Sequence, residues 1–155
     1  MEDRTPAGDV LTDIVLRTFR LNGQLLAAAE TMARPAGLTA AWWQVLGAVL
    51  REPLSVAGIA RDMGLARQSV QRIADLLVDK GMAEYVPNPA HRRAKLLRPT
   101  ANGWAAIARL RDAQHAFANR ISAAVGEHDL RQALGVMEKL IAALAADQEQ
   151  GQESE

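Results

Sequence analysis

The sequence predicts a mainly α-helical protein that carries one small β-hairpin. Apolar residues recur with helical periodicity along most of the 155 residues, and a short helix, a glycine turn and a second helix follow one another between residues 55 and 80. Directly afterwards, two short segments of alternating apolar and polar residues enclose a turn that contains proline and asparagine. This order is that of a winged helix-turn-helix core with further helices at both ends.

Two helices are expected before this core and two after it. The first spans residues 9–33 and ends at a break that contains proline and glycine. Thr39 is a suitable N-cap for the second, which we expect to continue until Pro53 ends it. The last two helices are expected over residues 100–125 and from residue 127 or 128 to about residue 146.

The core itself is bounded by capping residues and glycines. Ser55 can cap a short helix that Gly64 closes, and a longer helix is expected over residues 66–80. The two strands of the hairpin are expected at residues 82–86 and 94–98.

Composition excludes several classes of function. The chain has no cysteine, which rules out disulfides, thiolate metal sites and thiol-based redox sensing. The acidic N-terminus lacks the apolar segment of a secretory signal, and no apolar run approaches the roughly 18 residues that a membrane span needs. We therefore expect one soluble, cytoplasmic domain over residues 1–155, without membrane contact.

The net charge is zero, but the charges are unevenly distributed along the chain. Residues 61–98 hold eight cations and four anions, a net +4, whereas residues 1–13 carry −3 and residues 147–155 carry −4. A basic centre suits a polyanionic partner in spite of the neutral total. We expect the acidic tail at residues 147–155 to be solvated and disordered.

The helix over residues 66–80 has two distinct faces. One is a stripe of apolar residues spaced at i, i+3, i+4 and i+7, as expected of a buried face. The other carries amide, hydroxyl and guanidinium groups, which match the hydrogen-bonding edges of base pairs in the major groove. The residues predicted to face bases are Gln68, Ser69, Gln71 and Arg72, with Arg67 at the edge of the groove.

The predicted hairpin gives an independent indication of DNA binding. Its tip at residues 88–93 carries cations beside the base-reading helix, where they suit phosphates or the minor groove of an adjacent turn. The predicted backbone or minor-groove contacts are Ser55, Arg92, Arg93 and Lys95. Either feature alone is compatible with an ordinary solvated surface, but both together, in this order, favour DNA binding.

A family resemblance covers the same region. The matching stretches are LTAAWWQVLGAVL at residues 38–50 and LSVAGIARDMGLARQSVQRIADLLVDKGMAEYVPNPAHRRAKLLRPTANG at residues 54–103. They resemble the second helix and the DNA-binding core of the MarR family of transcriptional regulators. The resemblance implies a dimeric repressor or activator whose DNA affinity often responds to a small phenolic or lipophilic molecule. Under this assignment, residues 38–99 form the DNA-binding lobe, and residues 9–33 and 100–146 form dimerisation helices.

The sequence departs from the family pattern at two positions. Ala66 stands at the start of the base-reading helix, where such regulators usually have Ser or Thr, so a helix cap is missing. His91 stands in the wing where such regulators usually have an Asp that helps to hold an arginine. The geometry of the wing is therefore less closely specified than that of the helix.

Both ends of the chain carry more apolar surface than a small winged-helix core can cover. Packing within one subunit would explain this surface, but we favour dimerisation, because exposed stripes of this length need a partner. The residues expected at a homodimer interface are Leu11, Ile14, Val15, Leu130, Leu134, Met137, Leu140, Ile141 and Leu144. A two-fold dimer would bind a pseudo-palindromic operator with half-sites about one helical turn apart.

Aromatic side chains are candidates for an effector pocket, although ordinary core packing is the alternative. The candidate ligand-binding residues are Phe19, Trp42, Trp43 and His115. The histidines do not pair with carboxylates at metal-ligand spacing, and no nucleophile or phosphate-loop motif is present. We therefore expect neither an enzyme nor a protein with a metal or another cofactor.

The function predicted from the sequence is a homodimeric, sequence-specific regulator that binds double-stranded DNA. Repression of transcription, relieved by a small phenolic or lipophilic ligand, is the expected mode of action. The alternative is a winged-helix module that binds a protein and not DNA. The basic central segment argues against that alternative.

Overall fold

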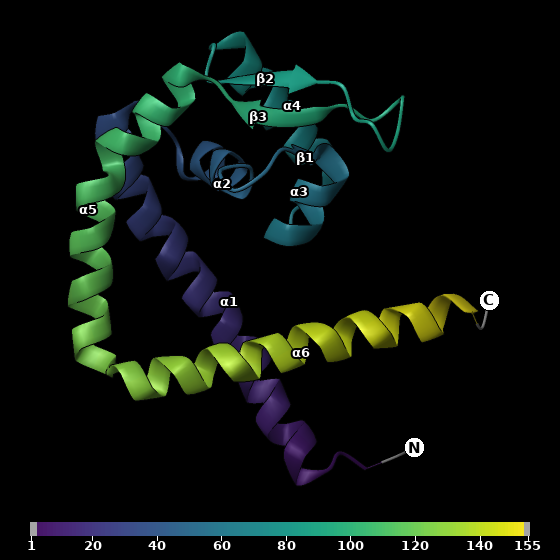
Figure 1. Cartoon of the computed structure of the whole chain (residues 1–155). Coiled ribbons are helices and arrows are strands. Elements are labelled where there is room, and N and C mark those ends of the chain that lie inside the picture. The colour runs from purple at the N-terminus through teal and green to yellow at the C-terminus, as the bar shows by residue number, and fades with distance from the viewer. Residues whose placement is uncertain (1–2, 154–155) are drawn as a thin grey trace. The chain divides into compact units, whose positions relative to one another are not determined.

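The computed structural model describes residues 3–153 and confirms a mainly helical fold with a small antiparallel sheet (Figure 1). The chain divides into two compact units, Met1–Asp112 and Ala113–Glu155, and the boundary falls inside α5 (Ala101–Val125). In the part of the chain that is described, no helix is long and apolar enough to cross a bilayer.

The first helix, α1 (Pro6–Ala33), begins three residues before the predicted start. The side chain of Thr5 accepts a hydrogen bond of 3.0 Å from the amide of Gly8, and Pro6 occupies the first helical position, where a missing N–H costs nothing. The predicted break after α1 is a short 3₁₀ turn, η1 (Arg34–Ala36), which ends at Gly37 with φ 77°. Of the residues in α1, Ala33 alone is fully buried, and most of the others are exposed.

The second helix, α2 (Ala40–Ala48), is capped as predicted but ends earlier than predicted. The Thr39 side chain accepts a 3.1 Å hydrogen bond from the amide of Trp42. The expectation that Pro53 ends the helix is wrong. The hydrogen bonds tighten at Val49, whose amide donates to the carbonyl of Leu46 at 3.2 Å, and this turn places Val49 in the core.

The helix-turn-helix consists of α3 (Val56–Met63) and α4 (Arg67–Asp79). Ser55 caps α3 through a 3.1 Å hydrogen bond from the amide of Gly58, and Gly64 closes it in the left-handed conformation with φ 64°. The start of α4 at Ala66 has no side-chain cap, as the sequence predicts. The predicted apolar stripe of α4 is buried against α2 and α3, and comprises Val70, Ile73, Ala74 and Leu77.

The sheet has three strands, β1 (Leu54–Ser55), β2 (Ala83–Val86) and β3 (Leu96–Pro99), in the order β1-β3-β2 with antiparallel pairing. The prediction of a two-stranded hairpin is therefore incomplete, because β1 is only two residues long and too short to show alternation. In addition, β3 begins at Leu96, so that Ala94 and Lys95 belong to the connecting loop. Figure 1 shows this loop projecting beyond the helices of the first unit.

The second unit consists of the end of α5 and of α6 (Glu127–Glu153), joined at Gly126 with φ 98°. The sequence predicts that α6 ends near residue 146 and that a disordered tail follows. In the structure, residues 147–153 instead continue the helix. These residues are mostly glutamine and glutamate, which have good helix propensity, and no proline interrupts them.

Candidate nucleic-acid interface

The exposed face of α4 carries the residues predicted to read bases. Because the apolar stripe faces the core, the side chains of Arg67, Gln68, Gln71 and Arg72 are turned to solvent. Ser69 is only partly exposed, so less of its side chain is available to contact bases. The structure thus brings the predicted amide and guanidinium groups onto one surface of the helix.

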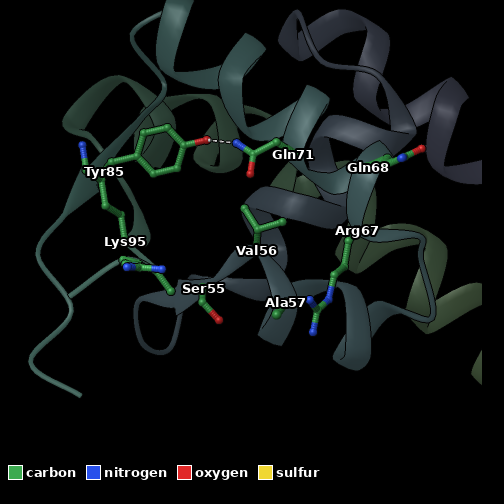
Figure 2. A pocket seen from close by; sticks show the side chains of 10 residues that line it. Ser55, Val56, Ala57, Arg67, Gln68, Gln71, Tyr85 and Lys95 are labelled. Atoms are coloured by element: carbon green, nitrogen blue, oxygen red, sulfur yellow. Dashed lines mark hydrogen bonds between the residues drawn. The ribbon is translucent and has the colours of Figure 1, made fainter. Parts of the chain in front are cut away.

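A basic cavity of about 510 Å³ lies beside this face, between the starts of α3 and α4, strand β2 and the wing loop (Figure 2). It is lined by Ser55, Val56, Ala57, Arg67, Gln68, Gln71, Tyr85, Arg93, Ala94 and Lys95. Three of these residues are cationic and none is acidic. Six of the nine residues predicted as DNA contacts therefore line a single concave surface.

The amide end of α3 opens onto the same cavity. Ser55 Oγ is occupied by the amide of Gly58, while Val56 and Ala57, the first two residues of the helix, line the wall. The positive end of a helix dipole and its free amides attract anions. Helix and side chains together therefore give this cavity a positive potential of the kind that suits a phosphate group.

The wing carries the remaining predicted cations. Asn88 organises its tip, since its side chain accepts from the amide of Ala90 at 3.0 Å and its carbonyl accepts from the amide of His91 at 3.3 Å. Arg92 is exposed and lines a second hollow of about 400 Å³ together with Lys95. An asparagine turn thus shapes the segment in which the family pattern has an aspartate.

An ion pair joins the two strands behind this tip. Arg98 Nε lies 2.7 Å from Glu84 Oε1, and these two residues face each other directly in the β2–β3 register. An opposite-charge pair across neighbouring strands stabilises their register modestly. The cations of the wing loop are therefore carried on a defined pair of strands.

Sequence reasoning missed a hydrogen-bond network between α4 and β2. Tyr85 Oη donates to Asp75 Oδ1 at 2.6 Å, and Gln71 Nε2 donates to both Asp75 Oδ1 and Tyr85 Oη at 3.0 Å. Burial, followed by the hydrogen bond and the negative charge of Asp75, raises the pKa of Tyr85 to about 12. The one signal in the sequence is the position of Asp75 on the polar face of α4. Tyr85 lies fourteen residues from Gln71, so helical spacing could not predict their contact.

The predicted dimerisation residues are exposed within each unit. In α1, Leu11, Ile14 and Val15 are exposed, and Phe19 is 70% exposed. In α6, the exposed predicted residues are Leu130, Leu134, Met137, Ile141 and Leu144, while Leu140 is partly buried. Both helices thus carry apolar faces that their own unit leaves uncovered.

The candidate ligand residues have different surroundings. Trp42 and Trp43 are partly buried against the core of the first unit, as the core-packing alternative expects. Phe19 is exposed on α1, and His115 is exposed in the second unit. Their role in binding a ligand stays a prediction.

Comparison with known proteins decides the family. A family model described as the MarR family matches residues 36–94. Rv2011c, an uncharacterised protein of Mycobacterium tuberculosis, is 35% identical over 139 residues, which cover 90% of this chain and 97% of the relative. The chain belongs to the MarR family. The resemblance is thereby confirmed over residues 38–94.

Solved structures show that the fold of this MarR-family chain is that of transcriptional regulators. MosR of M. tuberculosis, solved in complex with DNA, has a TM-score of 0.68 and 23% identity, covering 85% of this chain and 96% of MosR. CouR of Rhodococcus jostii RHA1, solved with bound p-coumaroyl-CoA, has a TM-score of 0.69 and 24% identity, covering 83% of this chain and 92% of CouR. At these identities the likeness shows a shared fold.

Proposed function

We propose that this MarR-family chain is a cytoplasmic transcriptional regulator that binds double-stranded DNA in a sequence-specific way. The observation that carries the proposal is the basic cavity beside the polar face of α4, which is lined by Arg67 from the start of α4 and by Arg93 and Lys95 from the wing loop. MosR, a protein of the same fold, has been solved in complex with DNA, which supports this assignment.

In the proposed complex, α4 enters the major groove. Gln68, Gln71 and Arg72 contact base edges, with Ser69 at the margin, because these groups occupy the exposed face of the helix. The cavity receives the phosphate backbone, held by its three cations and by the amide end of α3 at Ser55. Arg92, which is exposed beside the second hollow, reaches the backbone or the minor groove of the adjacent turn.

The salt dependence of binding tests this arrangement. Arg93→Ala should weaken binding to all sequences alike and reduce the slope of log K against log salt by about 0.9, the contribution of one phosphate contact. Arg72→Ala should instead cost about 1–3 kcal/mol at a single base pair. Arg17→Ala is a matched control, since it removes an exposed cation of α1 that pairs with Asp13.

The same measurements can contradict the proposal. If neither the Arg93 nor the Arg72 variant changes affinity or salt slope, the cavity and the helix face do not bind DNA. Absence of any binding at low salt, with DNA from a random pool, would favour the alternative that this winged helix binds a protein.

We also propose that the regulator acts as a homodimer through its terminal helices. α6 has no buried residue among those described and exposes Ile141 by 67%. A second copy of the chain is the occupant that fits, because a two-fold pair places two copies of α4 against a pseudo-palindromic operator. Sedimentation equilibrium tests this: Ile141→Glu should shift the mass from two chains toward one, whereas Lys139→Glu, which changes charge on an exposed polar position, should not.

Repression and its relief complete the proposal. CouR, which shares the fold, has been solved with p-coumaroyl-CoA, and this supports a small aromatic or lipophilic effector for the present chain. Phe19, Trp42, Trp43 and His115 are the candidate contacts. A ligand that quenches tryptophan fluorescence and releases operator DNA in the same concentration range would support this part. An unchanged spectrum and unchanged DNA binding across a panel of phenolic acids and their thioesters would refute it.

A further inference from the structure

The network of Gln71, Asp75 and Tyr85 determines which atoms of Gln71 are free at the DNA interface. A primary amide has two N–H donors and one carbonyl acceptor. Nε2 of Gln71 makes two hydrogen bonds of 3.0 Å, one to Asp75 Oδ1 and one to Tyr85 Oη, so the donor side of the amide faces this pair of acceptors. Among the described residues, Gln71 Oε1 has no hydrogen-bond partner. Figure 2 shows the nitrogen turned to Tyr85 and the oxygen turned away from it.

The orientation of this amide follows from the chemistry of its neighbours. A carboxylate only accepts hydrogen bonds, so Asp75 can receive the amide nitrogen of Gln71 but would repel its oxygen. Tyr85 donates its own proton to Asp75 at 2.6 Å, which leaves the phenol oxygen as an acceptor for Gln71. Tyr85 keeps that proton at neutral pH, well below its pKa of about 12. Flipping the amide would break two hydrogen bonds and set oxygen against oxygen.

We propose that Asp75 and Tyr85 are positioning residues that make Gln71 present only its carbonyl oxygen to DNA, so that Gln71 selects adenine or cytosine on the strand it faces. The inference rests on the proposed function and names the specificity of the same surface. The sequence predicts only that Gln71 faces bases, and the network restricts which of its atoms can contact them. A free glutamine reads adenine through a donor and an acceptor together, whereas Gln71 has only the acceptor to offer.

The base edges of the major groove explain the selection. Adenine and cytosine each present an exocyclic amine there, N6 and N4 respectively, and these are donors for Oε1 of Gln71. Guanine presents two acceptors, and thymine presents an acceptor and a methyl group. Against either of these bases, the carbonyl oxygen would be left facing an acceptor or an apolar group. One position in each half-site should therefore accept adenine and cytosine about equally and reject guanine and thymine.

The proposal is tested by selection from a random DNA pool, followed by affinities for the best site with each of the four bases at the position that Gln71 reads. The wild type should prefer adenine and cytosine at one position by about fivefold or more, the size expected of one hydrogen bond. Gln71→Ala should abolish the preference at that position and no other. Tyr85→Phe should free one N–H, which can then donate to adenine N7, so adenine should gain several-fold over cytosine.

A matched control separates positioning from general support of the wing. Glu84 precedes Tyr85 in β2 and forms an ion pair with Arg98 of β3. Glu84→Gln removes this ion pair, and it should leave the base preference unchanged. If Tyr85→Phe and Glu84→Gln change affinity alike without altering the preference, the network only stabilises the wing and the proposal is overturned. Thermal melts of both variants would check that each is folded.

The proposed function and the role of Asp75 and Tyr85 in positioning Gln71 are refuted by different results. If the wild type binds no DNA specifically, the proposed function fails and the inference fails with it. If it binds specifically but Gln71→Ala changes no single position, the proposed function stands and the inference is overturned. The network itself is measured without DNA from the side-chain ¹⁵N amide signals of Gln71: Tyr85→Phe should shift one of the two amide protons strongly, and no shift would contradict the hydrogen bond.

Discussion

Gly103→Ala should be among the most destabilising single-methyl changes in this protein. Gly103 is buried in the first turn of α5, and a Cβ there would collide with the carbonyl oxygen of Met82 and lie 3.2 Å from Leu46 Cδ2. The same carbonyl accepts the amide of Thr100 at 3.1 Å, so it cannot retreat without losing that bond. Thr100 Oγ1 further ties the start of α5 to the carbonyl of Gly81 at 2.6 Å.

The magnitude follows from these contacts. Overpacking of a core position costs about 1–3 kcal/mol, and each hydrogen bond lost at the helix start adds about 1 kcal/mol. We therefore expect the free energy of unfolding to fall by about 2–4 kcal/mol, measured from urea denaturation at constant m-value.

Gly23→Ala supplies the matched control, because it adds the same methyl within α1 with nothing inside 4 Å. It should stabilise the protein by up to about 1 kcal/mol, the helix preference for alanine over glycine. An unfolding free energy for Gly103→Ala within about 0.5 kcal/mol of wild type would show that α5 is not held closely against the turn at Met82.

Three further outcomes can be measured on the purified protein. Tyr85 is the one tyrosine of the sequence, so its ionisation can be followed by ultraviolet absorbance; the midpoint should lie near pH 12, and Asp75→Asn should lower it. Because folding raises this pKa, the contribution of Tyr85 to stability is complete below about pH 10 and is lost as the pH rises toward 12; a normal midpoint near 10 would contradict the network. Ala66→Ser should supply the missing cap of α4 and raise the free energy of unfolding by about 1 kcal/mol, and a loss of stability would count against it. Leu77→Ala, at a fully buried position of α4, should lower that free energy by about 2–5 kcal/mol, whereas a change below 1 kcal/mol would show that the core had been misassigned.

The helix-turn-helix could be predicted from the sequence because its signals are local. Ser55 and Gly64 bound α3 as expected, and the spacing of the apolar residues identified the buried face of α4. Those signals depend on residues within one or two turns of each other, which a sequence displays directly. The exposed face of α4 follows from the same spacing.

The remaining features depend on contacts that a sequence does not display. β1 exists because Leu54 and Ser55 pair with β3, more than forty residues further along the chain. The early end of α2 coincides with the burial of Val49 in the core, a tertiary contact that the position of Pro53 does not reveal. The basic cavity likewise forms only when the wing loop is brought beside the starts of α3 and α4.

The contact between Gln71 and Tyr85 has an evolutionary consequence. It places part of the immediate environment of the base-reading helix on a strand outside that helix. A substitution in β2 can therefore alter what α4 offers to DNA while the sequence of α4 stays unchanged. Two regulators with identical base-reading helices need not share an operator, and drift in the wing strand is a route by which duplicated copies could acquire separate targets.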